Sequence, residues 1–408
     1  MQCFLVGGCV RDKLLGLPVK DHDWVVVGAD PQTMLTHGFR PVGRDFPVFL
    51  HPQTQEEYAL ARTERKSGRG YHGFSFHAAP DVTLEQDLAR RDITINAIAE
   101  DENGNIIDPF NGQRDLQQRV LRHVSPAFVE DPVRVLRIAR FAARFNFTIA
   151  DETKDLIAQM IADGELAYLV PERVWQELSK ALLTDKPSLF FTTLREVGAL
   201  KELFPEVDAL FGVPQNPKWH PEVDTGVHVM MVIDQAARLS DDLAVRFSAM
   251  CHDLGKGQTP ADILPSHKGH EATSIRLTRD LCDRLRVPKE TRNLAVKVAE
   301  FHTDVHLLFE LDAERVLYVL EGIDSFRRPE RFQQYLLAGE ADFRGRPGYE
   351  DAPMPEGNAF QACYEAAAAV SATEFIEAGL SGIAIGEAIR RKRIEKIAQT
   401  LDEYRPAA

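Results

Sequence analysis

The chain has 408 residues, 44% of them hydrophobic, which predicts about two to four domains with a sizeable buried core. Its 48 Lys and Arg residues against 62 Asp and Glu residues give a formal charge of −14, which argues against a protein coated in positive charge but allows a local basic groove for nucleic acid. The five cysteines are scattered without a C-x-x-C pair, so we expect neither disulfides nor a cysteine zinc site. Without a signal-like start or an apolar run near about 18 residues, we expect a cytoplasmic protein with no membrane span.

Two short apolar runs flank the first helix that the sequence predicts. Phe4-Leu5-Val6 stops at a pair of glycines and predicts a buried strand. Val10 to Leu15 predicts a helix that ends at Gly16. Trp24 to Val27 predicts a second strand. The turn between the first strand and the helix, and the turn before the second strand, therefore lie close to one another in the sequence.

Residues that suit phosphate binding and metal binding lie in and near these two turns. Glycines at positions 7 and 8 let backbone amides approach an anion, and Arg11 adds a guanidinium for phosphate oxygens. Asp21 and Asp23 are two residues apart, a spacing that puts both carboxylates on one face of an extended chain. Carboxylate oxygens together with substrate phosphates are the ligands that Mg²⁺ takes.

The order strand, G-G, R-D, helix, D-x-D, strand resembles the signature of the DNA polymerase β-like nucleotidyltransferase superfamily. Its form here, G-G-x-V-R-D-x-L-L-G-x-x-x-x-D-x-D, resembles the bacterial (class II) tRNA nucleotidyltransferases, the CCA-adding enzymes and their poly(A) polymerase relatives. The resemblance implies an α+β head in which Asp21 and Asp23 are catalytic and hold Mg²⁺, while Gly8 and Arg11 bind ATP or CTP. Glu57 stays open as a third carboxylate.

Residues 24–110 continue as mixed α/β. Pro31 to His37 predicts a short helix, and 47–51 and 57–61 predict two strands. The basic, glycine-rich stretch from Arg62 to Gly73 indicates an exposed, mobile loop, and the resemblance implies a flexible element that touches triphosphate or RNA. The later motif R-R-D-x-T-I-N-A contains Arg91 and Asp92, to which the resemblance assigns binding of the sugar and phosphates.

From Gln113 the apolar period becomes helical. Four arginines, at 134, 137, 140 and 144, are spaced three or four apart on one helix, which favours an anion-binding face over a plain solvated stripe. The stretch resembles the family motif E-D-x-x-R-x-x-R, which implies that Asp131 and Arg134 pair with the base of CTP or ATP. Cytosine and adenine both carry an amine beside a ring acceptor, whereas guanine and uracil carry a carbonyl at that position. We assign Arg137 and Arg140 to the triphosphate.

Histidines concentrate in the following helical region. His228 lies in one helix, and His252-Asp253 ends the amphipathic helix from Leu243 to Leu254. This pattern indicates a divalent metal site and resembles the HD phosphohydrolase superfamily, H…HD…H/D. His302 is our last ligand, with Asp304 left open, and His270 is a candidate for a second metal or the phosphate. Such donors suit Ni²⁺, Mn²⁺ or Co²⁺, which would act as a Lewis acid.

The resemblance implies four parts: a nucleotidyltransferase head at 1–112, a helical neck and body at 113–220, an HD domain at 221–330 and a helical extension at 331–408. The implied reaction adds CCA to the 3′ end of tRNA from CTP and ATP and releases pyrophosphate. The HD domain would add 2′,3′-cyclic phosphodiesterase, 2′-nucleotidase and phosphatase activity. Two alternatives stay open: a poly(A) polymerase, and an HD hydrolase with a regulatory nucleotide-binding head. We expect a monomer or a homodimer.

Overall fold

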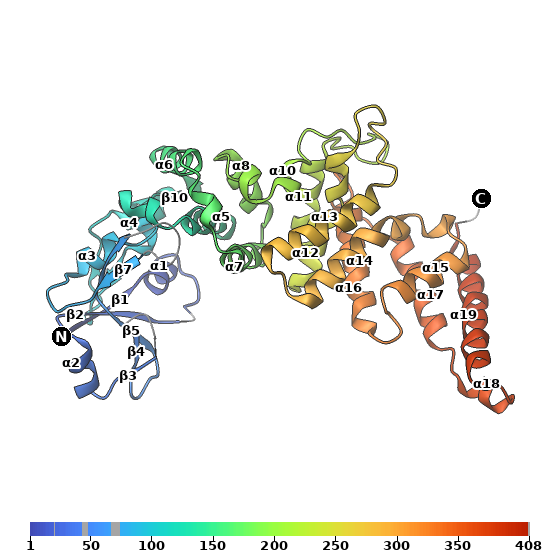
Figure 1. Cartoon of the computed structure of the whole chain (residues 1–408), viewed down its shortest axis with the longest axis horizontal. Helices are drawn as coiled ribbons and strands as arrows, with labels where there is room; N and C mark the ends of the chain where they lie inside the picture. The colour runs from blue at the N-terminus through green and yellow to red at the C-terminus, as the bar shows by residue number, and fades with distance from the viewer. Residues whose placement is uncertain (20, 43–47, 67–73, 407–408) are drawn as a thin grey trace. The chain divides into compact units, whose positions relative to one another are not determined.

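The computed structural model describes residues 1–19, 21–42, 48–66 and 74–406 (Figure 1). The chain forms two compact units: Met1–Glu177 with Thr192–Leu203, and Leu178–Phe191 with Phe204–Ala408. The chain crosses between the units three times: within α7 (Pro171–Leu182), within α8 (Ser188–Glu196) and after Leu203. A mixed sheet with helices lies in the first unit and the second is helical, so the predicted fold class is confirmed. The four finer ranges stay predictions.

The first unit is built on a seven-stranded sheet with the order β3-β4-β5-β2-β1-β8-β9. Its strands are β1 (Gln2–Val6), β2 (Asp23–Val27), β3 (Arg40–Pro41), β4 (Val48–Leu50), β5 (Glu57–Leu60), β8 (Ala99–Glu100) and β9 (Ile106–Ile107). Strand β2 pairs antiparallel with β1 and parallel with β5. Alternate side chains of β2 enter opposite cores: Val25 packs with Phe4, and Val26 packs with Met34. Strand β2, which begins at Asp23, is therefore packed against a hydrophobic core on each face of the sheet.

Helices and short ladders complete this unit. The helices are α1 (Gly8–Leu14), α2 (Pro31–Thr36), α3 (Leu84–Ala89), α4 (Gly112–Gln118), α5 (Val133–Phe145), α6 (Asp151–Ala162) and α9 (Leu200–Leu203), with one-turn helices at Thr94–Asn96, Pro126–Glu130 and Glu165–Tyr168. Strands β10 (Val120–Leu121) and β11 (Thr148–Ile149) pair in parallel.

The predicted loop from Arg62 to Gly73 is corrected in part. Its first half contains β6 (Thr63–Lys66), which pairs antiparallel with β7 (Phe74–His77). Backbone pairing with β7 explains a strand where the composition favours a loop. Residues 67–73, the glycine-rich part of the predicted loop, lie outside the described residues, as does Pro47 of the predicted strand at 47–51.

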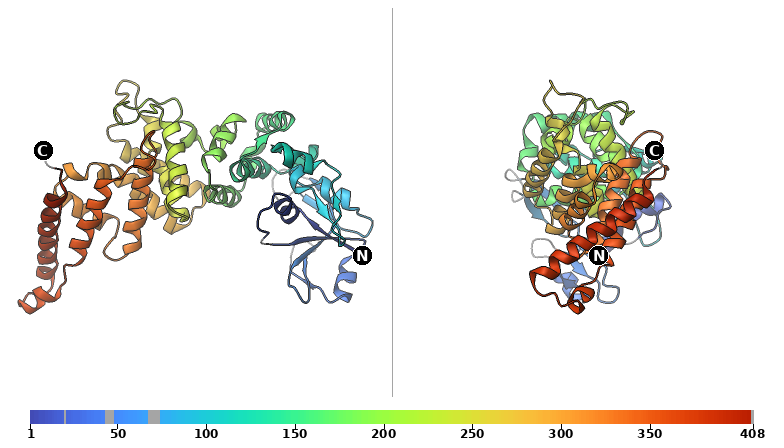
Figure 2. Two further views of the ribbon diagram at one scale, coloured as in Figure 1. Left: turned by 180° about the vertical axis from the view of Figure 1, so that it is seen from behind. Right: turned by 90° about the vertical axis from the view of Figure 1, so that its right-hand side faces the viewer.

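The second unit is a helical stack (Figure 2). Its elements are α10 (Pro205–Asp208), α11 (Thr225–Leu239), α12 (Leu243–Cys251), α13 (His270–Leu285), α14 (Lys289–His306), α15 (Ala313–Gly322), α16 (Pro329–Arg344), α17 (Pro355–Ala368), α18 (Thr373–Glu377) and α19 (Ile383–Tyr404), with one-turn helices at Leu254–Gln258 and Leu308–Glu310. Helix α14 packs on α12, α13 and α16, and α19 packs on α15 and α17. Within the described ranges, no helix is long and apolar enough to cross a membrane.

One predicted helix end is corrected. Helix α12 ends at Cys251 rather than at Leu254. Asp253 leaves the helical backbone, with φ −108° and ψ 11°, and the chain continues as a separate short helix from Leu254. The two residues of the His-Asp pair therefore occupy the turn between two helices, where their side chains point in different directions from those on a continuous helix.

A buried arginine, Arg246 on α12, ties the segment 178–191 to the rest of the second unit. Its guanidinium donates to the carbonyl oxygens of Leu182 at 2.7 Å and Thr184 at 2.9 Å, and also to those of Ala237 and Ser240. The side chain is 4% exposed. Hydrogen bonds from a buried charge to carbonyls are strong, and losing the donor leaves several acceptors unsatisfied.

We therefore expect Arg246→Ala to lower the free energy of unfolding of the second unit by about 3 kcal/mol. Scanning calorimetry of the full chain measures this as a lower melting temperature of one transition. Arg238→Ala is the matched control, because Arg238 is 54% exposed and pairs with the exposed Asp351, so its loss should change stability by less than about 0.5 kcal/mol. Equal melting temperatures for the two variants would contradict the assignment.

Candidate active sites

The register of β2 and β5 sets the direction of the predicted metal-binding aspartates. Trp24 and Tyr58 are paired across the two strands and stack with ring centroids 5.2 Å apart, so they share one face of the sheet. Asp23 and Glu57 form the preceding pair and therefore share the opposite face. Asp21, two residues before Asp23, is exposed, as are Asp23 and Glu57. The structure thus places three carboxylates at the start of neighbouring strands, which fits a divalent cation.

Glu56, just before β5, contacts the residues that alternate with the two aspartates at the start of β2. The Glu56 carboxylate accepts from the indole of Trp24 at 3.2 Å and lies 2.9 Å from Nδ1 of His22. Since His22 and Trp24 are directed to Glu56, the alternating Asp21 and Asp23 are directed away from it. The sequence order Asp-His-Asp-Trp therefore produces two faces with different partners.

The glycine turn between β1 and α1 is a place of close approach. Gly7 has φ 73°, and a Cβ built there would lie 2.7 Å from a terminal nitrogen of Arg91. Arg91 in turn contacts the carboxylate of Asp87 at 3.3 Å and the Asn96 carbonyl at 3.4 Å. Only glycine admits both this backbone conformation and this neighbour. The predicted phosphate-binding residues of two separate motifs, around Gly8 and Arg91, are therefore brought together.

Arg11 and Arg137 join the same region through a buried polar chain. Arg11 donates to the Asn96 side chain at 2.5 Å, Asn96 donates to Asp92 at 3.0 Å, and Arg137 donates to Asp92 at 2.8 Å. Burial by itself raises the pKa of Asp92, but Arg137 and Asn96 hold that pKa well below its usual range. Asp92 is therefore an anion that orients the arginines, and its predicted direct contact with substrate stays a prediction.

The predicted arginine face of α5 is engaged rather than solvated. Arg134 donates to the carbonyls of Ala127 at 2.9 Å and Arg90 at 2.6 Å. Arg140 contacts Glu177 through Nε at 2.5 Å, and Arg134 and Arg140 are both 9% exposed. Arg144 reaches the carboxylate of Asp12 on α1 at 2.8 Å. These contacts fix the guanidinium orientations from several elements of the first unit.

Arg173 is a site residue that the sequence reasoning missed. Its guanidinium makes a bidentate contact with Asp131, at 3.0 and 2.8 Å, and the amide of Val133 donates to the same carboxylate at 3.1 Å. The two residues lie 42 positions apart, on either side of α5 and α6. A proline-initiated helix that begins Pro-Glu-Arg was visible in the sequence, but nothing local indicated its partner.

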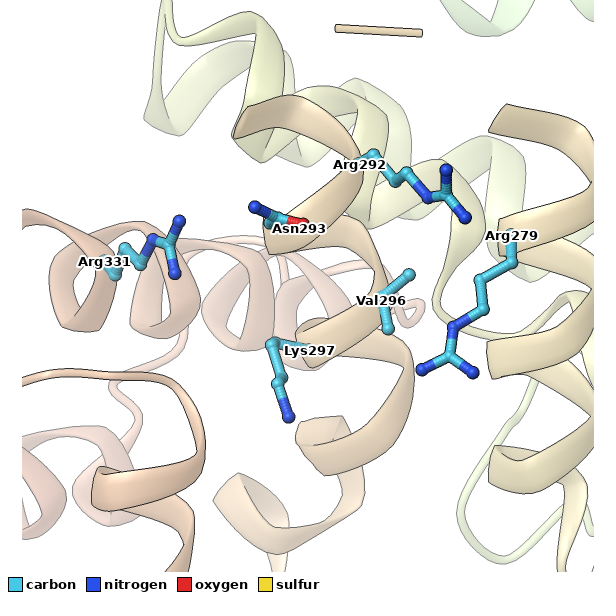
Figure 3. A pocket seen from close by; sticks show the side chains of 6 residues that line it. All are labelled: Arg279, Arg292, Asn293, Val296, Lys297 and Arg331. Carbon is cyan, nitrogen blue, oxygen red and sulfur yellow. The ribbon is translucent and has the colours of Figure 1, made fainter. Parts of the chain in front are cut away.

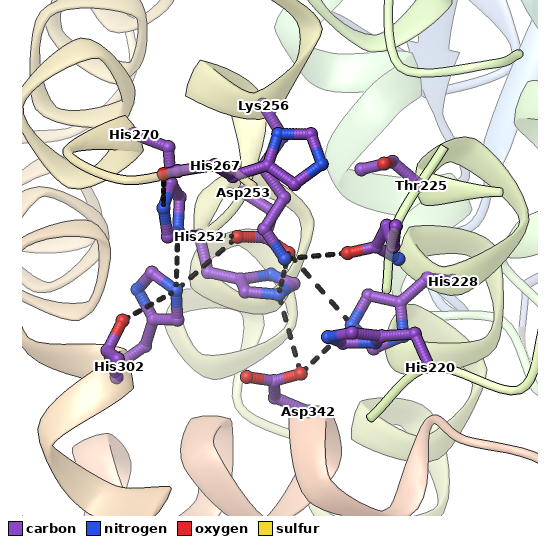
Figure 4. Close-up of polar contacts among 12 residues, drawn as sticks. His220, Thr225, His228, His252, Asp253, Lys256, His267, His270, His302 and Asp342 are labelled. Atoms are coloured by element: carbon purple, nitrogen blue, oxygen red, sulfur yellow. Dashed lines mark hydrogen bonds and ion pairs between the residues drawn. The ribbon is translucent and has the colours of Figure 1, made fainter. Parts of the chain in front are cut away.

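In the second unit, six buried or half-buried side chains point toward one another (Figure 4). They are His228 of α11, His252 and Asp253 of the turn after α12, His270 of α13, His302 of α14 and Asp342 of α16. Their ligand atoms fall into two groups, His228 with His252 and Asp342, and Asp253 with His270 and His302, each within 4.8 Å. Four predicted residues and His270 are therefore brought together.

Backbone contacts fix which nitrogen of each histidine faces inward. Nδ1 lies against a carbonyl oxygen in His252 (Ala249, 2.7 Å), His270 (His267, 2.8 Å) and His302 (Val298, 3.3 Å). A carbonyl only accepts, so Nδ1 carries a proton, and Nε2 faces the cluster and is an acceptor whenever the ring is neutral. The Nε2 atoms of His270 and His302 lie only 3.2 Å apart. Two acceptors at this distance repel one another unless a cation or a proton lies between them.

The donor chemistry of this cluster fits divalent cations. Among the described residues, Nε2 of His252 and Oδ1 of Asp253 are buried without a hydrogen-bond partner. Burial opposes the charged ring, but Asp253 and Asp342 raise the pKa of His252 to about 10. Burial likewise opposes ionisation of Asp342, while His252 and His306 hold its pKa well below the usual range. The cluster thus has ionised carboxylates around inward-facing nitrogens, an arrangement that a metal ion stabilises.

The structure separates the two open candidates for the last ligand. His302 Nε2 lies 3.4 Å from Asp253. Asp304 instead makes a bidentate ion pair with Arg315, at 2.8 Å for both contacts. Two residues along a helix differ in direction by about 200°, so only one of them faces the cluster.

Sequence reasoning missed Asp342 and Glu222. Asp342 lies 3.0 Å from His228 and 2.7 Å from His306, and it offers the final carboxylate typical of an H…HD…D set. Glu222 lies 2.9 Å from Nδ1 of His228, on the side of the ring opposite the Nε2 that meets Asp342. Asp342 lies in a helix 114 residues after His228, with no histidine beside it, so it gives no local sequence signal.

Comparison with known families agrees with this division of sites. Residues 3–122 match the Poly A polymerase head domain, residues 146–211 match a probable RNA- and SrmB-binding site of polymerase A, and residues 225–324 match the HD domain. The head match covers β1, the aspartate turn and the Arg91 motif. The HD match covers His228, His252, Asp253, His270 and His302, and ends before Asp342.

Two curated relatives match along the whole chain. The Multifunctional CCA protein of Thioalkalivibrio sulfidiphilus is 60% identical over 407 residues, which is 99% of this chain and 100% of the relative. The Multifunctional CCA protein of Alkalilimnicola ehrlichii is 57% identical over 412 residues, with 100% of both chains covered.

Solved structures share the fold at low identity. A CCA-adding enzyme in complex with ATP is 22% identical with a TM-score of 0.65, covering 98% of this chain and 88% of that one. The Thermotoga maritima CCA-adding enzyme complexed with tRNA is 22% identical with a TM-score of 0.63, covering 99% and 90%. A CCA-adding enzyme in complex with CTP is 23% identical with a TM-score of 0.63, covering 98% and 90%.

Proposed function

Because this chain belongs to the family of the multifunctional CCA proteins, we propose that it adds CMP, CMP and AMP to the 3′ end of tRNA from CTP and ATP, releasing pyrophosphate. The observation that carries the proposal is the sequence similarity to two members of the family along the whole length of the chain. The ATP, CTP and tRNA complexes of enzymes with the same fold support these substrates. The predicted cytoplasmic location and the oligomeric state stay predictions.

The reaction needs a carboxylate pair, a triphosphate clamp and a base reader. Asp21 and Asp23 would hold Mg²⁺, with Glu57 beside them on the same sheet face. Bound there, the ion supplies positive charge that stabilises the transferred α-phosphate and activates the 3′-hydroxyl. Gly8, Arg11 and Arg91 would bind the triphosphate from the opposite turn, since Arg91 packs against the neighbouring Gly7. Positioning of the two reactants makes up much of such catalysis.

Two arginines of α5 would complete the triphosphate clamp. Arg137 and Arg140 each contact a carboxylate through Nε, at Asp92 and Glu177 respectively. This contact orients the planar fork and directs the terminal amino groups away from the carboxylate. A triphosphate needs donors of this kind, and fixed orientation reduces the entropy lost on binding.

Base selection would centre on Asp131. Arg173 and the Val133 amide hold its carboxylate: they use both acceptor sites of Oδ1 and one of Oδ2, so Oδ2 keeps a lone pair for the exocyclic amine of cytosine or adenine. Arg134 would contribute to ring recognition, although its terminal nitrogens contact the Ala127 and Arg90 carbonyls here. Arg173 is a positioning residue in this scheme, because it acts on the base through Asp131.

The base reader is tested by Asp131→Ala. We expect the preference for CTP and ATP over UTP and GTP to fall by roughly 1–3 kcal/mol, or about 5- to 150-fold, since one bidentate contact is worth this much discrimination. The measurement is kcat/KM for each nucleotide with tRNA that lacks its 3′ end. Asp151→Ala removes a carboxylate that is 96% exposed in the same unit and should leave the preference unchanged. An unchanged preference in Asp131→Ala would refute the role of this residue.

For the second unit we propose metal-dependent hydrolysis of 2′,3′-cyclic phosphates, 2′-nucleotides and other phosphomonoesters. The six-residue cluster supports it, because imidazole nitrogens and carboxylates favour a transition metal such as Ni²⁺, Mn²⁺ or Co²⁺. The ions would supply Lewis acidity for attack of water on phosphorus. Lys256 lies 2.7 Å from Asp253 and could meet the phosphate from that side.

One assay tests the main proposal. Purified protein is given tRNA that lacks its 3′ end, with each of the four nucleoside triphosphates separately and then with CTP and ATP together. We expect CMP addition with CTP alone and a complete CCA end only with both nucleotides. Long adenylate tails from ATP alone would favour a poly(A) polymerase, and incorporation of none of the four would favour an HD hydrolase with a regulatory head.

A further inference from the structure

A basic hollow lies on the second unit, between α13, α14 and α16 (Figure 3). Its volume is about 330 Å³, and it is lined by Arg279, Arg292, Asn293, Val296, Lys297 and Arg331. None of these residues belongs to the histidine cluster. Four of the six are cations and none is acidic, in a chain whose formal charge is −14. The concentration of positive charge is therefore local and is not a property of the whole surface.

The cations of this basic hollow are available to an anion. No carboxylate in the described part of the chain lies within ion-pair distance of the exposed Arg279. Arg292 pairs with Asp283 at 2.6 Å and Arg331 pairs with Glu290 at 2.8 Å, but these two carboxylates are 63% and 66% exposed. Lys297 pairs with Glu300 at 2.8 Å, and this carboxylate is 28% exposed. Exposed ion pairs contribute little stability, so an incoming phosphate can replace them at small cost.

We propose that the basic hollow binds phosphodiester groups of the RNA substrate. Arginines recognise phosphate through paired N–H donors, and Lys297 adds a point charge that it shares with Glu300. Asn293 adds an amide that can donate to or accept from a ribose hydroxyl, which distinguishes RNA from simple anions. The proposal rests on the proposed function, since tRNA is the RNA to which the chain would bind.

The test measures binding of tRNA that lacks its 3′ end by the double variant Arg279→Gln with Arg331→Gln. We expect affinity to fall about tenfold at physiological salt, and the slope of log affinity against log salt to become shallower by about one to two units. Nucleotide addition at saturating tRNA should keep its wild-type rate, because the variant leaves the first unit unchanged. The melting temperature confirms that the variant is folded.

The control is Arg390→Gln with Arg391→Gln, two exposed residues of α19. It removes the same charge from the same unit, so it measures the effect of net charge alone. If the two double variants bind tRNA with equal affinity and equal salt slope, the proposal is overturned. Loss of affinity only in the Arg279 and Arg331 variant supports it.

A second arm distinguishes RNA from free phosphate. Inorganic phosphate is titrated while the melting temperature is followed. If phosphate stabilises the wild type but not the Arg279 and Arg331 variant, and tRNA affinity is the same in both, the hollow binds the free ion and the RNA proposal is overturned. If the wild type adds no nucleotide, but substitution of Arg279 and Arg331 lowers its affinity for tRNA, the proposed function fails while this RNA site is supported.

Discussion

Replacing either Asp21 or Asp23 by alanine is expected to abolish nucleotide addition, with a fall in kcat of about 10³-fold or more. Both carboxylates lie exposed at the start of β2, on the face opposite the Trp24 and Tyr58 stack, where they are the proposed Mg²⁺ ligands. Removing one takes away one of the two proposed ligands, so the ion and its charge are no longer held in place beside the α-phosphate. The measurement is single-turnover incorporation of CMP into tRNA that lacks its 3′ end.

Two further measurements make this result specific. Hydrolysis of 2′,3′-cAMP by the same variants should keep the wild-type rate, because its proposed ligands lie in the other unit. Asp81→Ala serves as the control, since its side chain is 83% exposed and it should add CMP normally. Near wild-type addition by Asp23→Ala would show that the metal assignment is wrong. Glu57→Gln tests the third carboxylate in the same assay.

The second large effect is expected in the histidine cluster. His252→Ala or Asp253→Ala should reduce hydrolysis of 2′,3′-cAMP and 2′-AMP to background. Each residue is a proposed metal ligand, His252 in the group with His228 and Asp342, and Asp253 in the group with His270 and His302. A chelator should abolish the same activity, and Ni²⁺, Mn²⁺ or Co²⁺ should restore it. Nucleotide addition should survive the substitutions and depend on Mg²⁺. Absence of turnover above the His252→Ala background with every metal would show that the domain is structural.

A matched pair of variants identifies the ligand on α14. His302→Ala should lower the metal content of the purified protein, measured by elemental analysis, together with the hydrolysis rate. Asp304→Asn should retain metal and activity, because Asp304 is engaged by Arg315 and not by the cluster. The opposite result would exchange the two assignments.

Local patterns predicted the elements, whereas distant partners could not be predicted. The order of β1, α1 and β2 follows from apolar runs, glycines and their spacing, all within Gln2–Val27. The contact of Arg144 with Asp12 joins residues 132 apart, and the contact of His228 with Asp342 joins residues 114 apart. Such pairs depend on how the helices pack, and the residues close to each partner in the sequence do not indicate that packing.

The same reasoning explains the arginines of α5. Their spacing predicted a shared face, but not that Arg134 would meet two carbonyls or that Arg140 would meet Glu177. Charged side chains are buried only when partners arrive from other elements. The choice between His302 and Asp304 was likewise undetermined, because both residue types ligate metals and only the direction of α14 separates them.

The chain passes between the units three times, within α7, within α8 and after Leu203, and this has a consequence for protein engineering. A fragment truncated to begin at Phe204 would omit Leu182 and Thr184, whose carbonyls accept from Arg246. The guanidinium would then lose two acceptors and the segment that buries it, and would keep only its contacts with Ala237, Ser240 and Asp241. Excision of the second unit as an independent recombinant domain therefore requires the segment 178–191 to be retained or grafted back, and a single cleavage point cannot release it intact.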